Sequence, residues 1–296
     1  MHVTVVGCGY VGLELARQLV ERDHEVVGVR RSESGLDAVA GTGATAVAAD
    51  ATDPDSLAAL PDTDAVVFAA SSGGRGAAAA RAVYVDGLAN VVREYAERTA
   101  TPDRLVYTSS TGVYGDHGGD WVDESTPLEP TTDKTRVLAE AERVALADAD
   151  AAGIDGTVAR FAGLYGPDRY RLERYIEGPV TEGYLNMVHR DDAAGAVRHL
   201  LVEDLARGEP VLVVDDEPAD KWAFADWLAD ECGVDRPEKR TTEERIAAGD
   251  LSEPAERRVR TSKRCSNAYL RELGYGFRFP TYREGYRDAI EGFLAG

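Results

Sequence analysis

Short, nearly all-apolar runs alternate with helix-like stretches along the first half of the chain. The apolar runs cover residues 3–6, 26–29, 44–48, 65–69, 104–107 and 156–161. The stretches between them that have a helical pattern include residues 53–60, 77–98 and 132–152. Strands that are apolar on both faces are typical of a parallel sheet with helices on both sides. We therefore predict an α/β fold with a doubly wound parallel sheet, which binds its ligands at the carboxyl ends of the strands.

The first apolar run leads directly into a glycine-rich turn, Gly-Cys-Gly-Tyr-Val-Gly, and a helix pattern follows. Gly7 allows the tight turn, Gly9 lets the backbone approach a pyrophosphate, and Gly12 lets the helix pack closely on the strand. The amides that begin the helix, at Tyr10 and Val11, are expected to face the phosphates. Because a second strand closes the βαβ unit, we predict a Rossmann-type dinucleotide site. The alternative is a tight turn that binds nothing.

The residues after the second strand indicate which dinucleotide is bound. An NAD site usually has an acid about 20 residues beyond the glycines, on the ribose 2′-hydroxyl. This chain instead has Arg30, Arg31 and Ser32. Arginine at this place suits a 2′-phosphate through charge-assisted hydrogen bonds. We therefore predict NADP(H), with NAD(H) as the less favoured cofactor and a solvated arginine pair as the structural alternative.

Two further strand ends are expected to border the cofactor. Asp50, followed by Ala51, ends the third strand and can accept a hydrogen bond from the adenine amino group. The alternative for Asp50 is a charge at the start of the next helix. The fourth strand ends at Ala69, Ala70 and Ser71, where small side chains let the ribose and pyrophosphate lie against the backbone.

The end of the fifth strand resembles a motif of a known family. Residues 109–115 read Ser-Ser-Thr-Gly-Val-Tyr-Gly, similar to the Ser-Ser-x-x-Val-Tyr-Gly of extended short-chain dehydrogenase/reductases, the NAD(P)-dependent epimerase/dehydratase family. Residues 160–167, 186–193 and 211–218 resemble later segments of the same family. The similarity covers about residues 1–216 and is strongest to small, atypical members. It implies hydride transfer between the nicotinamide and an alcohol or carbonyl carbon, with Phe161 beside the nicotinamide and nucleotide sugars as the usual substrates.

The family's activity rests on a Ser or Thr at the fifth strand and a Tyr-x-x-x-Lys on the next helix, where the lysine lowers the pKa of the tyrosine. Ser110 matches the first position, and capping the turn is its structural alternative. The family's Lys-x-x-x-Glu spacing then places Arg136 at the lysine and Thr132 at the tyrosine. Lys134 is expected to point away from position 136, because two residues rotate a helix by about 200°.

Threonine and arginine at the tyrosine and lysine positions change which group can transfer a proton. Arg136 can hold a cofactor ribose hydroxyl, but it stays protonated, and the Thr132 hydroxyl is too weak an acid to replace a phenol. Structurally, Thr132 can cap the helix and Arg136 can pair with Glu140. Tyr114 is then the first candidate to move the proton, ahead of Tyr165 and His189. Each of these three also has a plain packing or capping interpretation.

Residues 1–165, with 186–216 returning to them, are predicted to form the cofactor domain, and residues 166–296 a small substrate lobe. The lobe contains the densest basic run of the chain, at Arg257, Arg258, Arg260, Lys263 and Arg264. One hypothesis is that this run holds an anionic substrate, such as a nucleotide diphosphate. The alternative is a solvated helix face that balances an acidic surface.

Composition narrows the class of partner. The net charge of −20, with only 33 basic residues, argues against nucleic acid and against an anionic membrane as partners. Such an excess of acid suits a salt-filled, halophilic cytoplasm, where screening removes the self-repulsion. Three cysteines and five scattered histidines show no metal-ligand spacing. A small-molecule substrate is therefore expected, and Ala-rich faces of helices 77–98 and 132–152 permit a homodimer.

Two functions follow from the sequence. The first is an NADP(H)-dependent oxidoreductase or epimerase-type enzyme. The second is a dinucleotide-binding regulatory or interaction protein that has lost catalysis, which the missing Tyr-x-x-x-Lys supports.

Overall fold

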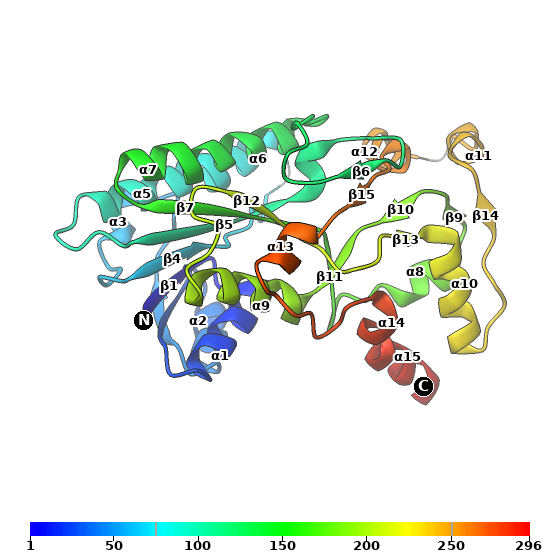
Figure 1. Ribbon diagram of the computed structural model, residues 1–296. Helices are drawn as coiled ribbons and strands as arrows, with labels where there is room; N and C mark the ends of the chain where they lie inside the picture. Colours follow the sequence, from blue (N-terminus) through cyan, green and yellow to red (C-terminus); the bar gives the residue numbers. More distant parts are fainter. Residues whose placement is uncertain (75, 250) are drawn as a thin grey trace.

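A seven-stranded parallel sheet forms the centre of the molecule (Figure 1), which we describe from a computed structural model for residues 1–74, 76–249 and 251–296. The strand order is β12-β7-β5-β4-β1-β2-β3, and all six neighbouring pairs are parallel. The strands are β1 His2–Val6, β2 Glu25–Arg30, β3 Thr45–Ala48, β4 Ala65–Phe68, β5 Arg104–Ser110, β7 Asp155–Phe161 and β12 Pro210–Val213. The predicted doubly wound parallel sheet is confirmed.

Helices cover both faces of this sheet (Figure 1). One layer holds α1 Tyr10–Val20, α2 Glu33–Ala40 and α9 Arg190–Val202. The other holds α3 Pro54–Leu57 and two long helices that each contain a π-helical segment: α4 Ala77–Arg81, η1 Ala82–Gly87 and α5 Leu88–Ala96, and α6 Asp133–Arg143, η3 Val144–Asp148 and α7 Ala149–Ala151. Both long helices match the stretches predicted from the sequence.

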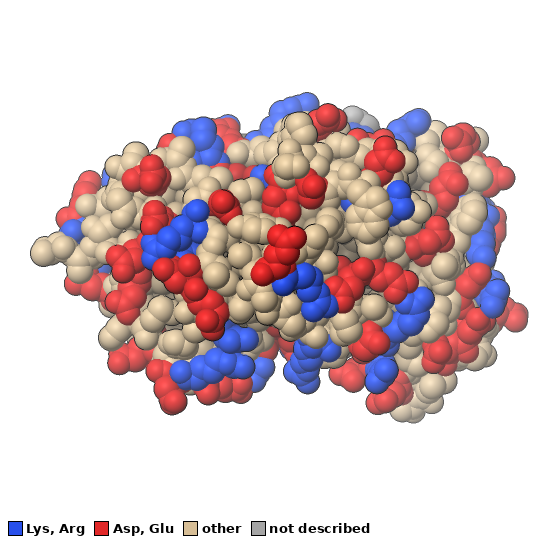
Figure 2. All heavy atoms as spheres, in the orientation of Figure 1, with Lys and Arg blue, Asp and Glu red and all other residues tan. Residues whose placement is uncertain are grey.

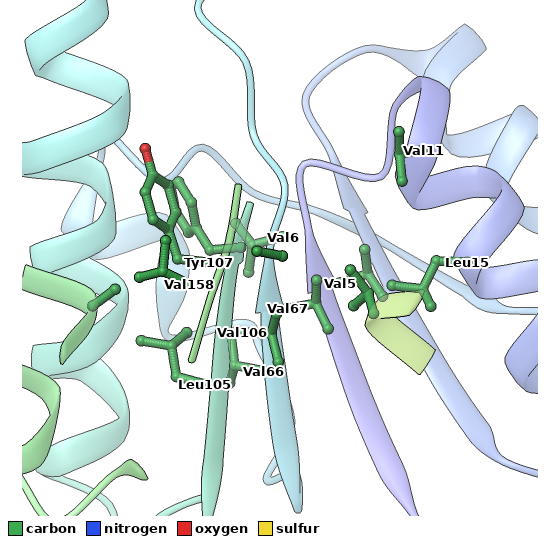
Figure 3. Close-up of a cluster of buried hydrophobic side chains, with 14 of the residues drawn as sticks. Val5, Val6, Val11, Leu15, Val66, Val67, Leu105, Val106, Tyr107 and Val158 are labelled. Atoms are coloured by element: carbon green, nitrogen blue, oxygen red, sulfur yellow. The ribbon is translucent and has the colours of Figure 1, made fainter. Parts of the chain in front are cut away.

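The core lies between the sheet and these helices because the central strands are apolar on both faces. Val5, Val67 and Val106 are fully buried on neighbouring strands, and Leu15 of α1 packs with them (Figure 3). Burying each such side chain contributes about 1.5–3 kcal/mol relative to leaving it in water. This packing fixes the carboxyl ends of the strands and so holds the loops that form the site.

The C-terminal part of the chain has its own smaller core. Phe224, Leu228, Tyr282 and Tyr286 pack together there with Leu172. The helices and strands in and around this smaller core are β9 Val180–Thr181, β10 Tyr184–Leu185, β13 Ala219–Asp220, β14 Lys239–Arg240, α8 Leu172–Ile176, α10 Lys221–Cys232, α11 Thr242–Ala247, α12 Glu253–Arg260, α14 Tyr282–Gly285 and α15 Arg287–Ala295. The predicted boundary at residue 165 stays a prediction.

One C-terminal segment returns to the large sheet (Figure 1). Strand β15, Arg264–Cys265, pairs with β6, Trp121–Val122, and α13, Ala268–Glu272, packs near β12. A short parallel pair, β8 Gly163–Tyr165 and β11 Met187–His189, lies where the two cores meet.

Acidic side chains spread over the visible face of the molecule, with basic side chains between them (Figure 2). This distribution agrees with the net charge of −20. In the described parts of the chain, every helix is too short or too polar to cross a membrane.

Candidate functional site

A cavity of about 430 Å³ opens at the carboxyl ends of β1, β4, β5 and β7. Its lining includes eight of the residues predicted from the sequence: Gly9, Tyr10, Val11, Ala69, Ala70, Ser71, Ser110 and Phe161. It also includes residues that the sequence did not single out for the site: Tyr84, Thr108, Ser109, Lys134, Thr135, Leu138, Ala162, Leu164 and Arg169. The volume is in the usual range for small-ligand and cofactor sites.

Each of the three glycines in the turn meets a different steric requirement. Gly7 has φ +84°, and a Cβ there would lie 2.2 Å from the Cα of Ala70. A Cβ on Gly12 would lie 3.1 Å from the carbonyl oxygen of Gly7, so this glycine sets the approach of α1 to β1. At Gly9 the nearest atom is the Nη1 of Arg30, at 3.1 Å, and the nearest backbone atom is 3.8 Å away. The backbone around Gly9 is therefore open, and Gly9 itself lines the cavity.

This turn fits a dinucleotide diphosphate. Among the described residues, no side chain caps the N-terminus of α1, and the first amides of a helix have no acceptor within it. Tyr10 and Val11 begin α1 and line the cavity, so their amides and the helix dipole favour a phosphate group beside Gly9. The residues present thus match the binding of an NAD(P) diphosphate.

The residues predicted to bind the adenylate half lie beyond the cavity lining, around the ends of β2 and β3. Arg30 donates from Nη1 to the carbonyl oxygen of Cys8 at 3.3 Å. Arg31 pairs with Asp50 at 3.1 Å, and Ser32 caps α2 by accepting from the Gly35 amide. Burial opposes ionisation of Asp50, but hydrogen bonds from Thr52 and Arg31 outweigh it and lower the pKa of this carboxyl.

The ion pair between Arg31 and Asp50 bears on the cofactor prediction. A 2′-phosphate at Arg31 has to compete with the Asp50 carboxylate that this arginine already holds. Ala51, next to Asp50, is buried. The roles of these residues in cofactor binding stay predictions.

The inner end of the cavity combines groups from three elements. Ser110 ends β5, and its hydroxyl accepts from the Gly112 amide at 3.1 Å, so it also caps the turn. Lys134 and Leu138 come from α6, four residues apart, and Phe161 comes from the end of β7. A hydroxyl and an ammonium group are thus available beside an apolar wall.

The structure places Thr132 and Arg136 outside the cavity, unlike the position that the family spacing predicts for a tyrosine and a lysine. Thr132 is the N-cap of α6, where its hydroxyl accepts from the Thr135 amide. Arg136 is exposed and pairs with Asp133 at 2.7 Å, not with Glu140. Neither Thr132 nor Arg136 lines the cavity, because the face of α6 that points into it carries Lys134 and Leu138.

Tyr114 is also placed differently from the prediction. It is fully buried, and its hydroxyl accepts a hydrogen bond from Arg160 at 2.6 Å. Arg160 in turn binds the carboxylate of Glu142 at 2.8 Å, and that carboxylate accepts from Ser109 at 2.6 Å. Burial raises the pKa of Tyr114 despite the neighbouring guanidinium. Tyr114 therefore belongs to a buried network behind the cavity wall.

Tyr165 and His189 lie outside the cavity lining too. Both are buried, and their rings meet edge to face with centroids 5.3 Å apart. His189 caps α9, because its Nδ1 accepts from the Asp191 amide at 3.2 Å. Burial lowers the pKa of His189 to about 4, although Asp191 opposes this change and Arg190 adds to it. The packing and capping interpretations of these two residues are the ones that the structure supports.

We expect His189 to make stability depend on pH. Its pKa is about 4 in the folded chain against an ordinary value of 6.5, so the unfolded chain binds more protons between these values. The contribution is complete above pH 6.5 and is lost as the pH falls toward 4. Between pH 7.5 and 5.5 the free energy of unfolding should fall by about 1.3 kcal/mol from this group.

Urea denaturation of the wild type and of His189→Asn at these two pH values measures this loss. Asparagine keeps a capping acceptor but does not titrate. The variant should lack the loss of about 1.3 kcal/mol that linkage assigns to the imidazole, while both proteins share the effect of the carboxylates. Equal pH dependence in both proteins would contradict the assignment.

The basic run does not reach the cavity. Lys263 is buried and donates from Nζ to the carbonyl oxygen of Gly115 at 2.9 Å. Arg264 donates to the carbonyl oxygen of Gly119 at 2.7 Å and lies over the rings of Trp121 and Tyr184. Lys263 and Arg264 thus fasten β15 to the loop after β5, and the hypothesis that the basic run holds an anionic substrate stays a prediction.

Comparison with known proteins agrees with this site. The family model described as NAD(P)H-binding matches residues 7–204. Protein YeeZ of Escherichia coli (strain K12) is 34% identical over an alignment of 207 residues, which covers 67% of this chain and 72% of the relative. A 3 beta-hydroxysteroid dehydrogenase/Delta 5-->4-isomerase of Mycobacterium tuberculosis is 27% identical, covering 79% of this chain and 70% of the relative. A solved structure from Methylobacillus flagellatus, described as a putative NAD-dependent epimerase/dehydratase, is 30% identical with a TM-score of 0.78 and covers 100% of this chain and 99% of that one.

Proposed function

Because this chain belongs to the NAD(P)H-binding family of short-chain dehydrogenase/reductase-like proteins, we propose that it is an NADP(H)-dependent oxidoreductase of the epimerase/dehydratase type. In this reaction a hydride passes between the nicotinamide and a carbon that bears an alcohol or a carbonyl, and a proton is exchanged between the substrate oxygen and water, so that NADPH and one proton reduce a carbonyl to an alcohol and yield NADP⁺. One observation carries the proposal: a single cavity joins the glycine turn at one end to Ser110 and Lys134 at the other.

The residues at the inner end have separate tasks in this proposal. Ser110 donates a hydrogen bond to the substrate oxygen and so polarises the reacting carbon. Phe161 and Leu138 exclude water from the nicotinamide side. Lys134 lines the cavity and is exposed, and no ion pair of its ammonium group occurs within the described residues. It is therefore a cation that meets an anionic substrate in this cavity, for which a nucleotide sugar is one class.

The preference for NADP(H) rests on Arg30 and Arg31 at the end of β2. The relative from Methylobacillus flagellatus is described as NAD-dependent, so the two cofactors have to be compared directly. Calorimetric titration in molar potassium chloride, which suits a chain of net charge −20, measures both affinities. NADPH should bind at least about tenfold more tightly than NADH, a difference of about 1.4 kcal/mol.

A second test concerns Ser110. Its replacement by alanine should lower turnover of NADPH with an aldehyde, ketone or nucleotide-sugar substrate by about 100-fold, since positioned hydrogen-bond donors contribute this much. Cofactor affinity should stay within about threefold, because the hydroxyl is proposed to act on the substrate and not on the diphosphate. Loss of its cap costs about 1 kcal/mol of stability, which a thermal melt checks. Unchanged turnover would remove Ser110 from the proposal.

The second candidate function is a cofactor-binding regulator without catalysis. The supporting observation is the pair that α6 presents to the cavity, Lys134 and Leu138, in place of a tyrosine and a lysine four residues apart. Tight NADPH binding with no turnover across the substrate panel favours this function over the enzyme.

A further inference from the structure

We propose that Arg169 binds the diphosphate of the dinucleotide, held for this purpose by the loop between β8 and α8. This inference rests on the proposed function and adds to it a residue outside the glycine turn. No motif in the sequence points to Arg169, and its loop meets the first turn of α1 across a separation of 157 residues, that between Tyr10 and Pro167.

The loop is fastened directly to the glycine turn. The Tyr10 hydroxyl donates to the carbonyl oxygen of Pro167 at 3.0 Å. Gly166, at φ +134°, passes so close that a Cβ there would lie 3.1 Å from the same hydroxyl. The Arg169 amide donates back to the carbonyl oxygen of Gly166 at 2.9 Å, which closes a tight turn. The position of Arg169 relative to α1 is thus set by several contacts.

The backbone of this loop is in an unusual conformation. Asp168 has φ +65° and Arg171 has φ +56°, the left-handed region that costs residues other than glycine some stability. Residues on the two sides of Arg169 therefore both adopt an unfavourable conformation. Such conformations cluster at ligand-binding segments. Here they turn the Arg169 side chain onto the ring of Tyr10, with its guanidinium carbon 4.1 Å from the ring centroid.

Arg169 carries a charge with no acidic partner in the described part of the chain. A second arginine, Arg190, also faces the Tyr10 ring, at 5.5 Å, but it pairs with Asp191 at 2.9 Å and does not line the cavity. Arg169 lines the cavity, and within the described residues no carboxylate lies at ion-pair distance from its guanidinium. Its positive charge is therefore available to an anionic ligand in the cavity.

These observations identify the ligand chemistry. The guanidinium stacks on the ring of Tyr10, the first residue of α1, and Arg169 lines the same cavity as Gly9 and Val11. A diphosphate at the N-terminus of α1 would therefore share this cavity with the Arg169 charge. Its planar donors match phosphate oxygens two at a time. Stacking on Tyr10 holds the plane of the guanidinium donors before the ligand binds.

Calorimetry on the full chain tests this role with two probes, NADPH and 2′-phospho-ADP-ribose, which keeps the diphosphate but lacks the nicotinamide. Arg169→Gln should weaken both ligands by about 10- to 100-fold, the usual range for a charge-assisted pair of hydrogen bonds. Arg169→Lys should lower the affinity for both probes by about 3- to 10-fold, because lysine keeps the charge but lacks the planar pair of donors. Arg171→Gln is the matched control on the same loop, since Arg171 does not line the cavity of the glycine turn, and it should change either affinity less than about twofold.

Wild-type affinity in Arg169→Gln for both probes would overturn the proposal. If the KM for the second substrate rises in that case, the charge serves a phosphate or carboxylate of the substrate instead. If the wild-type chain binds neither probe nor NADH, the proposed function itself fails, and this inference fails with it.

Discussion

Replacement of Gly9 by alanine should abolish dinucleotide binding while leaving the fold intact. The added Cβ meets no backbone atom closer than 3.8 Å and only the flexible end of Arg30 at 3.1 Å, so the chain can accommodate it. In a turn of this type the second glycine lets the backbone approach the diphosphate, so the same methyl group should block that approach. We expect the Kd for NADPH to rise at least about 100-fold, which corresponds to about 2.7 kcal/mol. Calorimetry and a thermal melt of the same sample separate binding from stability.

Gly7→Ala is the comparison that makes this result specific. At Gly7 a Cβ would lie 2.2 Å from the Cα and 2.3 Å from the amide nitrogen of Ala70, and φ is +84°. Backbone has to move to accept it, so we expect a loss of about 2–3 kcal/mol in stability as well as in binding. A Gly9→Ala protein that binds NADPH as the wild type does would show that the diphosphate lies elsewhere.

The sheet could be predicted because its signal is local. Each central strand is a short apolar run, and burial on both faces is what a parallel sheet between two helix layers requires. The apolar runs at residues 3–6, 65–69 and 156–161 form β1, β4 and β7 within one or two residues. The cofactor end of the site could be predicted for the same reason, since Gly9, Tyr10 and Val11 follow β1 directly.

The catalytic end could not be predicted by motif spacing, because α6 does not carry the family's residues. The spacing selects Thr132 and Arg136, whereas the residues of α6 that line the cavity are Lys134, Thr135 and Leu138. Lys134 and Arg136 do point apart, as the helical rotation requires, but Lys134 is the residue that lines the cavity. The apolar stripe at Val137, Leu138 and Ala141 indicates which face of α6 packs inward. Lys134 lies on that side of the helix, because it comes three residues before Val137 and four before Leu138.

Contacts between distant segments had no signal in the sequence. Arg169 reaches the cavity only because Tyr10 and Pro167 meet across two separate βα units. Tyr114 resembles a site residue by its motif, yet it is buried, and Arg160 on the neighbouring strand β7 binds its hydroxyl. The pairing of β5 with β7 brings Arg160 to the Tyr114 hydroxyl. A single sequence does not show which side chains such a pairing brings together.

Breaking the buried pair of Glu142 and Arg160 should have the largest effect on stability. Their side chains are 4% and 6% exposed, and two further contacts depend on them: Ser109 donates to Glu142, and Arg160 donates to Tyr114. Burial opposes the charge on Arg160, but the hydrogen bonds and charge of Glu142 outweigh it and raise the pKa of this guanidinium. Glu142→Gln leaves the guanidinium without a counter-charge, so we expect a loss of about 3–5 kcal/mol in urea denaturation. Cofactor affinity should fall too, because Ser109 lines the cavity.

A double-mutant cycle tests whether this cost comes from the pair itself. Arg160→Met alone should also cost about 3–5 kcal/mol, because it leaves the Glu142 carboxylate buried without its counter-charge. Once the cation is gone, a neutral amide at position 142 no longer leaves a charge uncompensated. The double variant should therefore be more stable than the sum of the two single losses predicts, by at least about 2 kcal/mol. Additive losses, or single variants within about 1 kcal/mol of the wild type, would show that the network tolerates separation of these charges and that Ser109 is held by other contacts.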